Sequence, residues 1–234
     1  MIGKPFDKDL LKNANFLLFL IVIFGLLLRL VFFSGMGISD SLSYSKAAQD
    51  INEGKGIDPN STLTLSTKLG LTFPMSLAYR LFGVNDFSSV IFVLLTSIAS
   101  IILIFYFGRL LFNEKIGLMA SFLLSFFPLD IVHATQLGSD LPSAFFMALG
   151  VYVFLNAEMN RKLKYGLDYL LSGIFIGIGY LIRESVLLIA LFFIFYIIYK
   201  RKFKREYFLV PAGVIIIFII EAFIFLYLTG DPTY

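Results

Sequence analysis

Seven long runs of apolar residues divide this chain, and they restrict its possible folds more than any other feature. Hydrophobic residues make up 59% of the 234 residues, and charged residues only 15%. A soluble domain cannot bury that much apolar surface, so the lipid bilayer must solvate most of the chain. Crossing the hydrocarbon core takes roughly 20 mostly apolar residues per helix. The sequence therefore predicts an all-α polytopic membrane protein with about seven transmembrane helices, at about 14–34, 88–112, 116–134, 139–157, 168–182, 184–200 and 207–229.

Basic residues are distributed unevenly among the connections between these runs. If the N-terminus is cytoplasmic, 13 of the 19 basic residues fall on cytoplasmic segments. Short cytoplasmic loops of membrane proteins carry such an excess of Lys and Arg. We therefore expect a cytoplasmic N-terminus. The net charge of +3 then reflects orientation in the membrane, and we expect no nucleic-acid partner.

Several kinds of catalytic and cofactor site have no counterpart in the sequence. There is no cysteine, which excludes disulfides and cysteine-based metal sites, and His133 is the only histidine. The sequence has no glycine-rich dinucleotide fingerprint, no P-loop and no HExxH pair. These absences argue against nucleotide-dependent chemistry and against a zinc protease.

The first polar connection, about residues 35–87, is much longer than the others. Long connections between helices usually carry function or have structure of their own. Here the pattern predicts two amphipathic helices lying on the outer membrane surface, one from Asp40 to about Gly54 and one at about 73–82. Asp40 is a carboxylate at the outer mouth of the predicted bundle, and such a group has few structural explanations.

This layout resembles the C-type superfamily of polyprenyl-phosphate-sugar-dependent glycosyltransferases, which includes protein O-mannosyltransferases and the bacterial aminoarabinose transferases. The resemblance rests on short motifs in a matching order. They are Asp40 with Tyr44 and Gly54, Lys68 through Gly83, Gly108–Phe112, Pro128 with Ser139–Pro142, and Leu228–Pro232.

Two departures from the family pattern are visible. The usual second acid after the first helix is Ser41 here. Typical members are also about twice this length and have a variable second half. The resemblance therefore implies that residues 1–234 form a single glycosyltransferase module, the conserved one, with the variable C-terminal half absent.

The resemblance implies an inverting transfer of a sugar from a polyprenyl- or dolichyl-phosphate donor to an acceptor at the outer face. Asp40 would be the general base, with the start of a surface helix as its structural alternative. Tyr44 would orient Asp40 or the sugar, or serve as an interfacial aromatic residue. Lys68 and Arg183 would bind the donor phosphate, or lipid headgroups.

Other polar residues of the outer connections are candidates for substrate contact. Asp140 would cap a helix, line the acceptor site or share a divalent ion with Asp40, and His133 would contact ligand or lie in a loop. We expect no required cofactor, because a hard cation needs several oxygen ligands and no Asp-x-Asp pair exists. Within the predicted spans, Arg29 is expected to snorkel or to pair with an acid, and Glu221 is a candidate functional carboxylate.

The expected partners are the lipid-linked donor, membrane lipids and an acceptor that is a protein, lipid or glycan. Two other functions stay open at this point. One is a catalytically silent subunit that binds lipid phosphate, which the serine at position 41 favours. The other is a small membrane transporter, although no inverted repeat is evident.

Overall fold

The computed structural model describes residues 8–37, 40–55, 68–160, 166–201 and 203–229, and these residues are all-α, as predicted. Residues 56–67 of the long connection and residues 230–232 of the last motif lie outside the described residues. The helices are α1 (Lys8–Val31), α2 (Asp40–Asn52), α3 (Leu69–Phe82), α4 (Asp86–Leu111), α5 (Glu114–Ser125), α6 (Pro128–His133), α7 (Asp140–Asn160), α8 (Leu167–Ile182), α9 (Ala190–Lys200) and α10 (Leu209–Thr229), with 3-10 turns η3 (Glu184–Ile189) and η4 (Arg205–Phe208).

Four helical segments are long and apolar enough to cross a membrane: Ala14–Val31, Asp86–Leu111, Asp140–Asn160 and Arg205–Tyr227. The apolar helix α8 is shorter. The predicted run 116–134 is two helices, because Pro128 begins α6 after the break at Phe127. The predicted run 184–200 begins as η3 before it continues as α9. The count of seven spans therefore stays a prediction.

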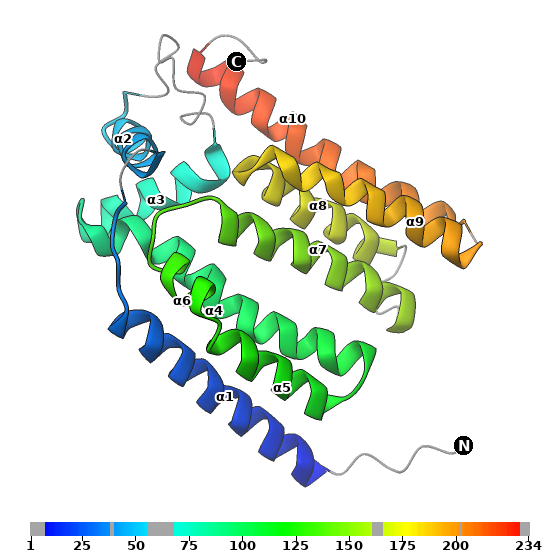
Figure 1. Cartoon of the computed structure of the whole chain (residues 1–234). Coiled ribbons are helices and arrows are strands. Elements are labelled where there is room, and N and C mark those ends of the chain that lie inside the picture. Colours follow the sequence, from blue (N-terminus) through cyan, green and yellow to red (C-terminus); the bar gives the residue numbers. More distant parts are fainter. Residues whose placement is uncertain (1–7, 38–39, 56–67, 161–165, 202, 230–234) are drawn as a thin grey trace, which may run out of the picture.

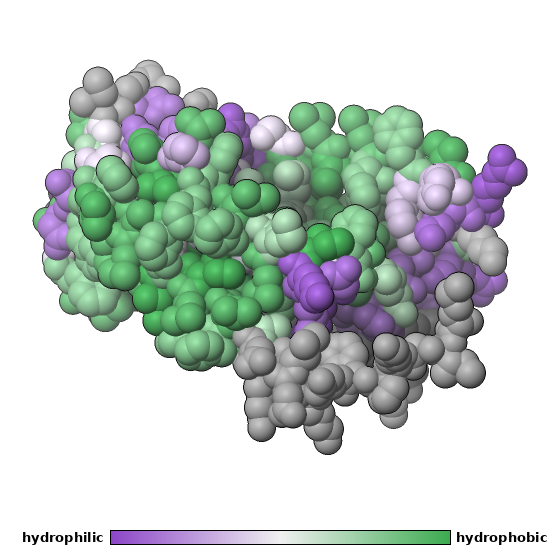
Figure 2. All heavy atoms as spheres, turned by 60° about the horizontal axis from the view of Figure 1, so that its bottom comes forward, coloured by the Kyte–Doolittle hydropathy of each residue, from purple (hydrophilic) through white to green (hydrophobic). Residues whose placement is uncertain are grey.

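The long helices nevertheless run back and forth between the same two ends of the molecule (Figure 1). One end carries α2 and α3, and we call it the α2–α3 end. The ends of α4, α7 and α9 lie at the opposite end. We call it the basic end, because Lys200 is the last residue of α9 and Arg201, Lys204 and Arg205 follow it. Hydrophilic residues gather toward the ends, and a broad hydrophobic surface lies between them (Figure 2).

The two predicted surface helices are present as α2 and α3, and α3 begins four residues before its predicted start. The backbone carbonyl of Lys68 accepts hydrogen bonds from the N–H groups of Leu71 and Thr72, both at 3.0 Å. It also accepts one from the Thr72 hydroxyl at 3.1 Å. These bonds extend the first turn of α3 back to Lys68, which places that lysine at the start of the helix.

Small residues allow neighbouring helices to approach closely. A Cβ added at Gly173 of α8 would overlap the backbone carbonyl of Val210 in α10, and one added at Gly213 would overlap the carbonyl of Leu170. Helices in lipid are held together mainly by close packing, because burying apolar surface gains little there. The glycines therefore hold α8 and α10 as one unit.

A buried ion pair joins α1 to the rest of the bundle. Arg29 of α1 has no exposed surface, and its guanidinium forms an ion pair with the buried carboxylate of Asp130 in α6. It also donates hydrogen bonds to the Ser97 hydroxyl in α4 at 2.8 Å, and to the carbonyls of Gly25 at 2.8 Å and Ser125 at 3.3 Å. Of the two roles expected for Arg29, the structure shows the pairing and excludes snorkelling.

Removing one member of this pair should destabilise the protein strongly. Arg29→Met leaves the Asp130 carboxylate buried without its counter-ion, at a cost of about 3–5 kcal/mol. We expect the double variant Arg29→Met/Asp130→Leu to regain much of that loss, because it buries no charge. Thermal unfolding in detergent measures both effects. A parental midpoint for Arg29→Met would show that the pair does not hold α1.

Candidate functional site

The segment that follows α1 is bonded to the segment that follows α6. The backbone N–H of Ser34 donates to Thr135 Oγ1 at 3.1 Å, and the two hydroxyl oxygens lie 3.2 Å apart. Gly35 forms an isolated parallel bridge with Gln136. Gly35 has φ of 74°, and a Cβ there would lie 3.2 Å from the carboxylate of Asp86, so the position requires glycine. The two connections are thereby joined side by side.

Ser41 continues this attachment into α2. Its hydroxyl donates a hydrogen bond of 2.9 Å to the carbonyl of Leu137. Ser41 is buried, and so is Leu137. Because Asp40 immediately precedes Ser41, this bond holds the first residue of α2 beside the segment that leads into α7.

A chain of hydroxyl groups fixes α2 against α3 and α4. The Tyr79 hydroxyl of α3 lies 2.8 Å from Ser45 Oγ of α2 and 2.8 Å from Ser89 Oγ of α4. Tyr79 is almost fully buried, so all three groups satisfy one another away from water. The surrounding core cluster consists of Tyr44, Ala48, Leu71, Met75, Tyr79, Val90, Val93, Leu137 and Ile182.

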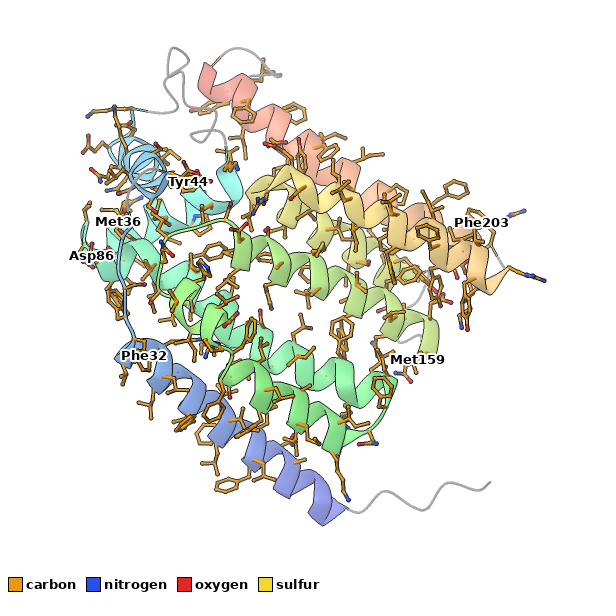
Figure 3. The ribbon with its side chains drawn as sticks, in the orientation of Figure 1. Phe32, Met36, Tyr44, Asp86, Met159 and Phe203 are labelled. Carbon is orange, nitrogen blue, oxygen red and sulfur yellow. The ribbon has the colours of Figure 1, made fainter. Side chains whose placement is uncertain are left out.

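A polar pocket of about 320 Å³ lies where these segments meet. It brings together four residues that the sequence singled out: Asp40 and Tyr44 of α2, His133 of α6 and Asp140 of α7. Tyr44 lies on the side of α2 that faces the bundle (Figure 3), and only 3% of it is exposed. Asp40, His133 and Asp140 are exposed. A buried aromatic wall thus adjoins three accessible polar groups.

The two carboxylates of the pocket occupy equivalent positions on their helices. Asp40 is the first residue of α2, and Asp140 is the first residue of α7. The free N–H groups of a helix start carry partial positive charge, which favours a carboxylate there. Two helix starts therefore meet at one pocket, and each carries a carboxylate as its first residue.

Lys68 and Arg183 lie beside the pocket. The ammonium nitrogen of Lys68 lies 6.0 Å from the centroid of the Tyr44 ring. Arg183 forms an ion pair with Asp140. Their two helices meet closely, because a Cβ at Gly70 of α3 would lie 2.9 Å from the backbone nitrogen of Ile182 in α8. The start of α3 and the end of α8 thus bring both cations to one side of the pocket.

Sequence reasoning missed three polar residues that line the same pocket: Gln136, Ser139 and the hydroxyl-bearing Ser41, which it treated only as a departure. Ser41 is the second residue of α2, whereas Gln136 and Ser139 lie on the connection between α6 and α7. Their signal was the high polarity of the short segment between two apolar runs.

Glu221 lies apart from this pocket, on α10, and is partly exposed. Among the described residues, no group of three or more His, Asp or Glu side chains is placed to hold a metal ion. The carboxylates of Asp40 and Asp140 supply fewer oxygens than hard cations usually take. A divalent ion shared by the two therefore stays a prediction.

The model of the dolichyl-phosphate-mannose-protein mannosyltransferase family matches residues 69–225, about two thirds of the chain. The match contains α3 to α9 entirely and most of α10. No curated protein and no solved structure matches the chain.

The attachment of the α1–α2 segment to the α6–α7 segment can be tested by a disulfide. The Ser34 and Thr135 hydroxyl oxygens are 3.2 Å apart, so cysteines at both positions place their sulfurs within reach of a bond. Because the chain has no native cysteine, no other thiol reacts with the labelling reagent. We expect Ser34→Cys/Thr135→Cys to lose both free thiols on mild oxidation.

Thiol labelling after denaturation measures that loss, and the two single variants serve as controls that keep their thiol. Persistence of two reactive thiols in the oxidised double variant would contradict the arrangement of the site.

Proposed function

The chain belongs to the dolichyl-phosphate-mannose-protein mannosyltransferase family, and from this premise we propose that it is an inverting glycosyltransferase module. The donor would be a sugar linked to polyprenyl or dolichyl phosphate, and the acceptor would be a protein, lipid or glycan outside the cell or in a lumen. The observation that carries the proposal is the pocket that unites Asp40, Tyr44, His133 and Asp140 at the membrane-surface helices.

In this mechanism Asp40 is the general base. Its carboxylate takes the proton of an acceptor hydroxyl while that oxygen attacks the anomeric carbon of the sugar. The new glycosidic C–O bond forms as the C–O bond to the lipid phosphate breaks on the opposite face. The bonding electrons leave with the phosphate, and the proton stays on Asp40 until water removes it.

The cations beside the pocket suit the leaving group. Negative charge grows on the phosphate as the bond to the sugar breaks, and positioned cations stabilise that charge. Lys68 is held over the Tyr44 ring, which lines the pocket. Arg183 forms an ion pair with Asp140, and this contact keeps its guanidinium beside the pocket.

The arrangement also gives the remaining residues defined roles. Gln136 and His133 present side chains that both donate and accept hydrogen bonds, which is the chemistry that recognises sugar hydroxyls. Tyr44 is nearly buried and supplies an apolar part of the pocket wall, beside which a sugar ring would lie. No part of the pocket requires a nucleotide.

A catalytically silent subunit that binds lipid phosphate is the second candidate, and Ser41 favours it. The family pattern places a second acid there, but the Ser41 hydroxyl is used to bind the Leu137 carbonyl. Such a subunit would bind the donor through Lys68 and Arg183 and would not turn it over. Binding and turnover measured on the same preparation separate the two functions.

The general-base role predicts the behaviour of Asp40→Asn. Asparagine keeps the shape of the side chain but cannot take the proton, so turnover should fall by about 10²–10⁴-fold while donor binding persists. Transfer of radiolabelled sugar from the lipid donor measures turnover. Asp86→Asn is the matched control, because Asp86 is an exposed acid that also begins a helix at this end, α4. Near-parental turnover in Asp40→Asn would exclude the base and direct attention to Asp140.

The phosphate role predicts weaker donor binding when either cation is removed. A charge-assisted hydrogen bond contributes about 1.5–3 kcal/mol, so Lys68→Ala and Arg183→Ala should each weaken binding about tenfold or more. Because Arg183 is nearly half exposed, its effect should lie at the lower end. Arg80→Ala is the control, since Arg80 is exposed on the last turn of α3. Unchanged binding in both variants would place the phosphate elsewhere.

A further inference from the structure

An apolar groove of about 470 Å³ opens between α9 and α10, and no residue that lines it lines the polar pocket. Phe154 of α7 and Ile176 of α8 lie at its base, and both are fully buried. Ile194 and Ile197 of α9 line one side, and Val214 and Phe218 of α10 line the other. Its volume is that of a binding site for an extended apolar ligand.

The groove exists because α9 does not pack fully against its neighbours. Among its described side chains, α9 has no buried residue, although its sequence is almost entirely apolar. Ile194 lines the groove and is still 52% exposed. The groove therefore opens sideways, toward the hydrocarbon of the membrane that surrounds these helices.

The groove ends among basic residues at the basic end of the molecule. Phe203, Tyr207 and Phe208 line it there, interleaved in sequence with Lys204 and Arg205. Lys200 is the last residue of α9 and Arg201 follows it, and both are exposed, as is Arg205. Aromatic residues beside exposed cations are typical of the membrane interface.

Two acids, Glu158 of α7 and Glu206 of η4, belong to this end, and Glu158 is engaged by groups other than Lys200, Arg201 and Arg205. Glu158 accepts hydrogen bonds from the Lys204 ammonium at 2.8 Å, the Tyr169 hydroxyl at 2.6 Å and the Tyr196 hydroxyl at 3.2 Å. Its two oxygens are thereby committed within the bundle. In the part of the chain that the structure describes, neither Arg201 nor Arg205 forms an ion pair.

Arg201 also has an unusual backbone. It ends α9 in the left-handed conformation, with φ of 49°, and it is the only described non-glycine residue with positive φ. Glycine is the usual residue at such a helix end. An arginine is less stable there, and strained backbone of this kind tends to be kept at binding sites.

We propose that the groove and these cations form a binding site for an anionic phospholipid. One acyl chain lies in the groove between α9 and α10, and the headgroup phosphate contacts Lys200, Arg201 and Arg205 in the leaflet at the basic end. The charges complement an anionic headgroup, and the adjoining apolar groove makes the site specific rather than a diffuse surface attraction. The lipid would fill the space that α9 leaves open.

This site goes beyond the proposed transfer reaction and does not depend on it. Lys68 and Arg183, which would bind the donor phosphate, lie at the opposite end of the bundle from Lys200 and Arg201. A donor with its phosphate at the polar pocket would leave the cations of the basic end without a ligand, whereas a phospholipid of that leaflet reaches them directly.

The test compares two phospholipids with identical acyl chains. The purified, delipidated chain is mixed in detergent with phosphatidylglycerol and phosphatidylcholine, and bound lipid is measured by native mass spectrometry. We expect preferential binding of phosphatidylglycerol. Arg201→Gly should weaken it about fivefold, the factor expected when one basic residue near an anionic headgroup is lost. This variant relaxes the backbone at position 201, so misfolding does not explain a loss.

The groove is tested by a matched pair of neighbouring substitutions. Ile194→Trp fills the groove, and Phe195→Trp changes an exposed residue of α9 that does not line it. Ile194→Trp should weaken binding at least about tenfold, since displacing two methylene groups of a chain corresponds to that factor. Phe195→Trp should bind like the parent.

Three outcomes would overturn the proposal. Equal binding of the two phospholipids would exclude headgroup recognition. An effect of Lys115→Gln as large as that of Arg201→Gly would show diffuse charge attraction, because Lys115 is exposed at the start of α5, away from the groove. Displacement of phosphatidylglycerol by polyprenyl phosphate, one for one, would assign the groove to the donor lipid.

Discussion

The guanidinium of Arg29 lies in a part of the bundle without water access, and the polar groups that surround it decide how the α2–α3 end is built. A buried cation is tolerated only when its charge and its N–H groups are satisfied. Asp130 supplies the charge, and Ser97, Gly25 and Ser125 supply further acceptors. These partners come from α1, α4, α6 and the end of α5, so one side chain fixes the relative positions of four helices.

The polar pocket depends on this arrangement through a short series of contacts. Asp130 holds α6, and α6 ends at His133, which lines the pocket. The residues just beyond α6 bind the segment that leaves α1, through Thr135 with Ser34 and through Leu137 with Ser41. Both ends of that segment are therefore tied to the same connection, between α6 and α7, and the position of Asp40 follows. Each contact is a hydrogen bond or ion pair in a largely buried setting, where such bonds are hard to exchange for water.

The sequence predicted the all-α fold, the two surface helices and a set of residues that the structure brings together, because each has a local signature. Apolar runs mark helices. Asp40 and Tyr44 lie on the long polar connection after the first run, and His133 and Asp140 lie at the facing ends of the third and fourth runs. The partner of Arg29 was not predictable, because residues 29 and 130 are 101 positions apart and several acids were available. The broken helix at Phe127 and the loosely packed α9 were also missed. Hydropathy reports how apolar a run is, but packing decides whether it forms one helix and how closely that helix contacts its neighbours.

The two carboxylates of the pocket begin helices that are held by different contacts, and this difference bears on which one would take the proton in the proposed transfer. Asp140 forms an ion pair with Arg183, so its oxygens are partly committed to positioning that cation. Asp40 precedes Ser41, whose hydroxyl is occupied by the Leu137 carbonyl. Serine at position 41 therefore removes a second carboxylate from the pocket and adds an anchor for the helix that carries the first. In the proposed transfer, an exposed acid on a firmly held helix start suits the role of general base, because the backbone fixes the direction from which its side chain approaches an acceptor.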